Sequence, residues 1–152
     1  MKQKLKKNIL IETCVIIMTL LLSASLVFNL KFNNNDELWN FSNIYKMANG
    51  YTIYKDLNVI DTPLFFWLGE LLFNFMGDNY LTYRIYNLII IFLLYYLIYL
   101  IFKTLKISKL KSIVYMLIIF LVTSKIAGIG ANYNSLAIVF YLLRNLAKFK
   151  NK

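Results

Sequence analysis

A long apolar run near the amino terminus is the feature that most limits the folds open to this chain. Residues 9–30 are apolar apart from Glu12 and small or hydroxyl side chains. Because an α-helix rises about 1.5 Å per residue, a run of roughly 22 residues is long enough to cross a hydrocarbon core of about 30 Å. Residues 85–102 form a second run of roughly 18 residues, which is also long enough to span.

Two weaker apolar runs follow, at residues 112–131 and 133–147, and the first of them contains Lys125. With these runs the chain is 60% hydrophobic, which is more apolar surface than a soluble domain of 152 residues can bury. The sequence therefore predicts an all-α, polytopic membrane protein. We expect one membrane domain over residues 1–152, with about four transmembrane helices at the four runs.

The first run is preceded by lysines, a feature that it shares with signal peptides. The apolar core of a signal peptide is usually about 7–15 residues long, and a small-x-small cleavage site follows it. The run here is longer and no such site precedes the polar loop, so an uncleaved anchor is favoured. Glu12 lies about one turn inside this anchor, where we expect it to snorkel or to pair with a lysine.

The charged residues predict how the chain is oriented. The formal net charge is +10, and the basic residues form clusters beside the apolar runs, before residue 9, at 103–111 and from 144 onward. Lysine and arginine accumulate on the cytoplasmic side of membrane proteins. We therefore expect a multi-pass protein of the plasma membrane with both termini in the cytoplasm and an extracytoplasmic loop at 31–84. The clusters are interpreted as topology signals and not as a nucleic-acid site.

Several kinds of chemistry are excluded by composition. The chain has no histidine and a single cysteine, Cys14, which lies inside the first apolar run. A Cys/His or Ser/His catalytic pair and a disulfide framework are therefore ruled out. The sequence also has no metal-ligand spacing, so no cofactor is predicted, although a requirement for a divalent metal is left open.

The polar interval at residues 33–63 is expected to contain the chemistry. In it Asp36 follows three asparagines, and apolar residues recur after it at nearly helical spacing until Gly50. This pattern predicts an amphipathic helix of about three turns along the membrane surface. Residues 51–60 are expected to be extended. Pro63 can open a second helix of about 12 residues, too short to span, which we expect to be re-entrant or interfacial and to end at Gly77.

Six features occur in a fixed order between the first two predicted spans. They are Asp36-Glu37, Gly50, Tyr54-Lys55-Asp56, Pro63, Gly77 and Arg84. This ordered set resembles the first extracytoplasmic loop of membrane glycosyltransferases of the GT-C type, in the family-39 group of protein O-mannosyltransferases and aminoarabinose transferases. The resemblance covers about residues 10–145, which correspond to the amino-terminal part of such an enzyme. We therefore expect the chain to be incomplete relative to the family and inactive alone.

The resemblance implies transfer of a sugar from a polyprenyl-phosphate donor to an extracytoplasmic acceptor. Such a reaction needs a carboxylate to take a proton from the acceptor, and cations to stabilise the departing phosphate. By resemblance, Asp36 and Glu37 are the expected catalytic residues, with Asp36 as the base or the acid of the acceptor site. Lys55, Asp56 and Arg84 are the expected substrate-binding residues.

The sequence departs from the family pattern at two places. Residues 132–135, on the expected outer side, carry asparagines where the family often has a second acid. Thr62 stands where the aminoarabinose transferases have a lysine, which argues against that substrate.

Each site residue also has a structural interpretation that needs no chemistry. Asp36 is a good helix N-cap, Lys55 and Asp56 can form a solvated pair, and Arg84 can snorkel at the interface. The competing hypothesis is therefore a non-catalytic small membrane protein. It would be a subunit or scaffold that packs against a partner membrane subunit, or a truncated remnant.

Overall fold

The structure is a computed structural model, and it describes residues 2–29, 35–126 and 131–150. Within these residues all regular secondary structure is helical. There is one isolated bridge, between Ile53 and Leu57, and no strand. The prediction of an all-α fold is thus confirmed for the described chain. The helices are α1 (Lys2–Asn29), α2 (Asn35–Ala48), α3 (Leu64–Met76), α4 (Tyr80–Thr104), α5 (Lys109–Ile126) and α6 (Tyr133–Lys150).

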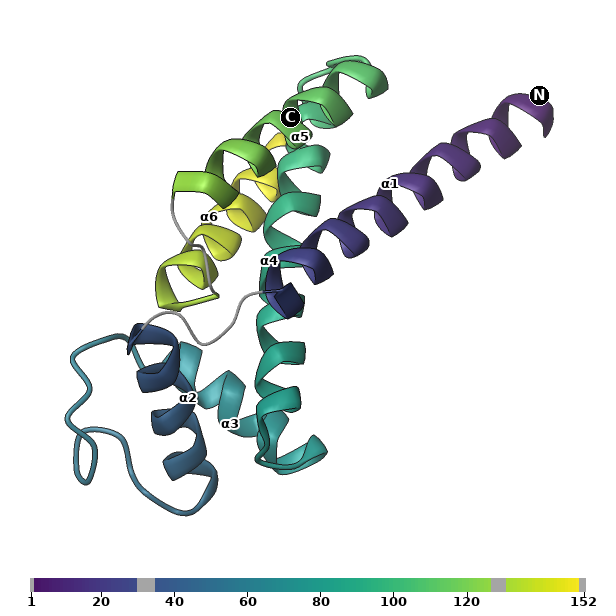
Figure 1. The fold of residues 1–152 in the computed structure, drawn as a ribbon. Coiled ribbons are helices and arrows are strands. Elements are labelled where there is room, and N and C mark those ends of the chain that lie inside the picture. Colours follow the sequence, from purple (N-terminus) through teal and green to yellow (C-terminus); the bar gives the residue numbers. More distant parts are fainter. Residues whose placement is uncertain (1, 30–34, 127–130, 151–152) are drawn as a thin grey trace.

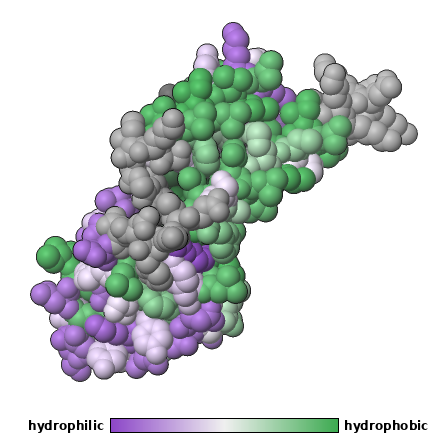
Figure 2. All heavy atoms as spheres, in the orientation of Figure 1, coloured by the Kyte–Doolittle hydropathy of each residue, from purple (hydrophilic) through white to green (hydrophobic). Residues whose placement is uncertain are grey.

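The helices divide the molecule into a polar end and an apolar end. α2, α3 and the loop between them pack together at one end, and α1, α5 and α6 extend from there toward the other (Figure 1). α4 runs through both parts, and both chain ends lie away from α2 and α3. Hydrophilic residues cover the α2–α3 end, whereas hydrophobic residues dominate the surface of the remaining helices (Figure 2).

Two helices are long and apolar enough to cross a membrane. They contain the stretches Ile9–Phe28 and Tyr80–Thr104, which overlap the first two predicted spans. Only 17% of the first stretch is buried inside the protein, so α1 differs from the core helix of a soluble protein, which is mostly buried. α5 and α6 correspond to the third and fourth predicted spans but do not meet the same criterion in the described residues. Their crossing of a membrane stays a prediction.

The two helices predicted for the polar interval are confirmed. α2 ends in a turn at Gly50, whose φ of 91° belongs to the left-handed region that glycine adopts readily. α3 follows Pro63 directly and ends at Gly77, whose N–H donates to the carbonyl of Phe73. Asp36, which was expected as a cap of α2, lies inside the first turn instead, because the helix already begins at Asn35.

The segment predicted to be extended contains a tight turn instead. Thr52 N donates a hydrogen bond of 2.9 Å to Oδ2 of Asp56, and Tyr54 has a φ of 66°. A short acidic side chain can close a turn by accepting a backbone N–H in this way. The Tyr54 hydroxyl then donates to the carbonyl of Asp61, at 2.8 Å, which fixes the end of the loop.

α2 and α3 pack closely because α3 has a glycine at their contact. A Cβ placed on Gly69 would lie 2.5 Å from Cδ1 of Ile44, a residue of α2 that is fully buried. Trp39 of α2 also meets Phe66 of α3 edge to face, with ring centroids 5.7 Å apart. Gly69 is therefore the residue that lets the two helices approach.

Gly69→Ala is expected to destabilise the α2–α3 contact by about 1–3 kcal/mol, because the added methyl group overpacks Ile44. Thermal unfolding of the purified protein in detergent micelles would measure this loss as a lower Tm. Ile44→Val removes the nearest carbon and should restore part of the Tm when it is combined with Gly69→Ala. Asn74→Ala, on the exposed side of α3, serves as the control. A Tm unchanged by Gly69→Ala would show that the contact is looser than described.

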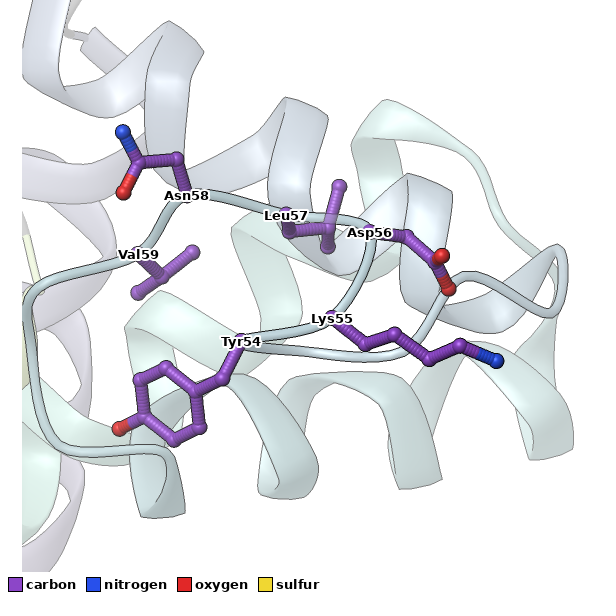
Figure 3. A pocket seen from close by; sticks show the side chains of 6 residues that line it. All are labelled: Tyr54, Lys55, Asp56, Leu57, Asn58 and Val59. Carbon is purple, nitrogen blue, oxygen red and sulfur yellow. The ribbon is translucent and has the colours of Figure 1, made fainter.

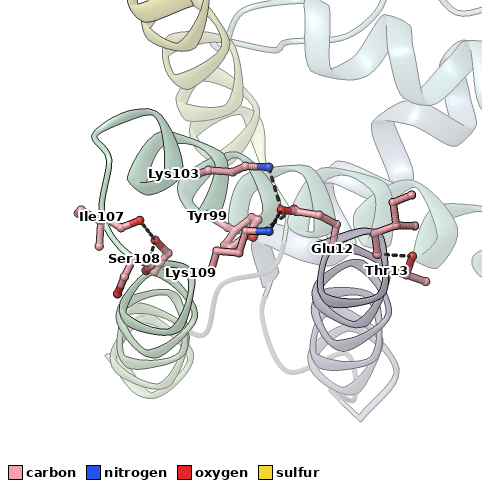
Figure 4. Close-up of polar contacts among 9 residues, drawn as sticks. Glu12, Thr13, Tyr99, Lys103, Ile107, Ser108 and Lys109 are labelled. Atoms are coloured by element: carbon pink, nitrogen blue, oxygen red, sulfur yellow. Dashed lines mark hydrogen bonds and ion pairs between the residues drawn. The ribbon is translucent and has the colours of Figure 1, made fainter. Parts of the chain in front are cut away.

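A polar cluster joins α1 to the junction of α4 and α5. Oε1 of Glu12 lies 2.8 Å from Nζ of Lys103 and 3.2 Å from Nζ of Lys109. The Tyr99 hydroxyl donates to Oε2 of the same carboxylate at 3.1 Å (Figure 4). The pairing expected for Glu12 is thus found, with lysines of α4 and α5.

Candidate functional site

The start of α2 is joined to α4 by a buried ion pair. Nη1 of Arg84 lies 3.0 Å from Oε1 of Glu37, and their side chains are only 6% and 11% exposed. Within the described residues Oε1 of Glu37 accepts no hydrogen bond of good geometry. The attraction between Glu37 and Arg84 is therefore chiefly that of opposite charges. Burial raises the pKa of Glu37, and the charge of the Arg84 guanidinium opposes this rise.

Arg84 also reaches the end of α1. Its Nη1 donates a hydrogen bond of 2.6 Å to the carbonyl oxygen of Val27. This carbonyl lies in the last turn of α1, where carbonyls have no partner inside the helix. The guanidinium carbon lies 4.6 Å from the centroid of the Tyr80 ring, which adds a cation–π contact. Arg84 therefore connects α1, α2 and α4 at one point.

Further polar side chains are buried near this pair. Asn40 lies one turn after Glu37 in α2. In α4, Tyr83 directly precedes Arg84, and Asn87 lies one turn after it. None of Asn40, Tyr83 and Asn87 is more than 2% exposed. Burying amides and hydroxyls in an apolar core is costly unless they find hydrogen-bond partners. The junction of α2 and α4 is thus a polar region inside an otherwise apolar and aromatic core.

Asp36 precedes Glu37 in α2 but does not share its burial. It is in the first turn of α2 and is exposed to solvent. Its carboxylate and that of Asp61 are both close enough to Tyr133, the first residue of α6, to act on the Tyr133 hydroxyl electrostatically. The structure therefore brings an acid of the loop to a phenol of α6, and the Asp36 carboxylate lies within electrostatic range of the same hydroxyl.

Asp61 is the residue that sequence reasoning missed. The sequence offered only asparagines around residue 133 as replacements for a second acid, and Asn132 is occupied as the cap of α6. Its Oδ1 accepts a hydrogen bond of 3.0 Å from the backbone N–H of Ser135. Asp61 lies well before α6 in the sequence, and no local pattern signals that the loop turns toward that helix. The second acid thus comes from an unexpected segment.

Lys55 and Asp56 lie elsewhere, at the tip of the loop. The Lys55 side chain points away from Tyr54 (Figure 3), whereas the Asp56 carboxylate accepts the N–H of Thr52 and closes the turn, and both residues are exposed. An open depression lies at this turn, lined by residues 54–59. The structure thus brings Glu37 and Arg84 together and places Asp36 at a separate point. The roles assigned to these five residues stay predictions.

In the part of the chain that the structure describes, no group of three or more His, Cys, Asp or Glu side chains could hold a metal ion. Comparisons with family models, curated proteins and solved structures found no match to this chain. The arrangement itself is chemically specific even so. An exposed carboxylate and a half-buried one, both acting on a phenol, can accept protons and hydrogen-bond to hydroxyl groups, whereas the buried pair can hold α2 in place.

Proposed function

We propose that the chain is the amino-terminal part of a membrane glycosyltransferase that moves a sugar from a polyprenyl-phosphate donor to an extracytoplasmic acceptor. The observation that carries this proposal is the position of Asp36. It lies in the first turn of α2, and that end of α2 is the one nearer the apolar helices (Figure 1). Its carboxylate acts electrostatically on the hydroxyl of Tyr133, as does that of Asp61. A lipid-linked donor presents its sugar at this depth, where polar and apolar surfaces meet.

Membrane placement is supported by the apolar surface of α1, α5 and α6. Large apolar side chains on these helices are exposed, among them Leu21 at 65%, Leu121 at 57% and Tyr141 at 63%. Monomeric soluble proteins rarely expose apolar surface that extends over several helices, whereas lipid covers it without cost. We infer that all four long helices cross the plasma membrane, with both termini in the cytoplasm and 31–84 outside.

The proposed reaction uses Asp36 as the base. Its carboxylate takes the proton of the acceptor hydroxyl while the acceptor oxygen attacks the anomeric carbon of the sugar. The bond between that carbon and the phosphate oxygen breaks, and the polyprenyl phosphate leaves with the electron pair. Lys55 is the cation proposed for the phosphate. Glu37 and Arg84 position Asp36, because their pair fixes the first turn of α2 against α4.

Transfer of a radiolabelled sugar from a polyprenyl-phosphate donor tests the proposal directly. Membranes that express this chain would be compared with membranes that express it together with any coding sequence found in frame after Lys152. The expected result is transfer only in the longer form. No transfer in either form, while the protein is inserted stably in the membrane, would overturn the proposal.

A non-catalytic membrane protein is the second candidate, and one observation favours it. Arg84 was expected to bind the phosphate, yet it is buried and held by Glu37 and Val27. The exposed face of α1 would then pack against a partner membrane subunit. Recovery of a partner protein with the chain, without any sugar transfer, would support this candidate.

A further inference from the structure

The charges of the protein are segregated between its two ends. Six of the seven acids lie within residues 36–78, in α2, α3 and the turns beside them. At the other end, α4 finishes, α5 begins and the last turns of α6 lie close by (Figure 1). The basic residues whose side chains are described there are Lys103, Lys106, Lys109, Lys111, Arg144 and Lys148.

Glu12 divides these basic residues into two groups. It is the only acid at this end of the described chain, and its carboxylate binds Lys103 and Lys109 (Figure 4). The other four side chains are exposed, and none of them forms an ion pair within the described residues. We call these four residues, Lys106, Lys111, Arg144 and Lys148, the exposed basic end.

Apolar residues accompany the exposed basic end. Leu105 and Leu110, on either side of the turn between α4 and α5, are 49% and 73% exposed, and Phe149 is 44% exposed. A surface that alternates basic and large apolar side chains is typical of segments at the boundary between headgroups and acyl chains. Long lysine and arginine side chains can reach the headgroups from there while their stems stay in apolar surroundings.

We propose that the exposed basic end binds the phosphate groups of anionic phospholipids in the adjoining leaflet. The proposal rests on the membrane placement given above and is independent of the transfer reaction. Each cation near an anionic surface strengthens binding by roughly fivefold, and the attraction weakens as salt is added. Lys103 and Lys109 contribute less, because Glu12 neutralises part of their charge.

Lipid-dependent thermal stability tests this proposal. The purified chain in neutral detergent would be titrated with phosphatidylglycerol, with phosphatidylcholine and with inorganic phosphate, and its Tm recorded. Phosphatidylglycerol should raise the Tm of the natural protein, and phosphatidylcholine should not. In a variant with Lys106→Gln, Lys111→Gln, Arg144→Gln and Lys148→Gln, half-maximal stabilisation should need about 600-fold more phosphatidylglycerol. Lys46→Gln, at an exposed lysine of the polar end, is the control.

Three outcomes would overturn the proposal. They are equal stabilisation by the two lipids, stabilisation by phosphatidylglycerol that survives in the fourfold variant, and stabilisation by inorganic phosphate at the same concentration. All four substituted side chains are exposed, so the Tm in detergent alone should match that of the natural protein. Membrane placement is tested separately, by the resistance of each variant to extraction with alkaline carbonate. The sugar-transfer assay is independent of both the lipid titration and the extraction.

Discussion

In a form of the protein that transfers sugar, Asp36→Asn should abolish transfer and leave the amount of protein in the membrane nearly unchanged. Asparagine has almost the same shape as aspartate but cannot accept the acceptor's proton at neutral pH. Loss of a positioned general base lowers the rate by about 10²- to 10⁴-fold. Asp36 is exposed, and the favourable charge interaction that its replacement removes at the start of α2 is worth about 0.3–1 kcal/mol.

Asp78→Asn is the control for this measurement. Asp78 is an exposed acid at the same end of the molecule, and it accepts a hydrogen bond from Asn49 at 3.1 Å. Its replacement should leave transfer intact. Asp61→Asn asks whether the second acid takes part, since Asp61 lies near the same tyrosine as Asp36. Full transfer by Asp36→Asn would refute the assignment of Asp36 as the base.

The local structure of the polar interval could be predicted because local chemistry decides it. Gly50 and Gly77 end α2 and α3 with φ angles of 91° and 95°, and Pro63 precedes the first turn of α3. The limits of these helices depend on residues within a few positions. The turn at residues 52–56 was not predicted, because Asp56 closes it through its side chain and was considered only as a charged residue.

The contacts of the site could be predicted only in part. Glu37 lies one and two turns before the buried residues Asn40 and Ile44, so its inward direction follows from helical spacing. The pairing of Glu37 with Arg84 depends on how α2 packs against α4. The sequence alone does not show which residues of two separate helices come into contact. The approach of Asp61 to Tyr133 depends in the same way on the path of a loop.

Arg84→Met should be the most destabilising single replacement in the protein. It would leave the Glu37 carboxylate buried without its opposite charge and the carbonyl of Val27 without its donor. Breaking a buried pair by removing one partner costs about 3–5 kcal/mol. Thermal unfolding in detergent micelles would show the loss, and Arg144→Met, at an exposed arginine of α6, should change the Tm very little.

A double replacement separates the charge effect from simple loss of packing. Two apolar side chains of similar volume often replace a buried ion pair with little loss of stability. Glu37→Met combined with Arg84→Met should therefore have a higher Tm than Arg84→Met alone, because no buried charge is left uncompensated. If the loss of stability in the double variant equals the sum of the losses in the two single variants, the pair contributes through packing and not through charge.

The same double variant tests the role of the pair in the reaction. In a form of the protein that transfers sugar, a stable double variant with low activity would show that the pair positions Asp36.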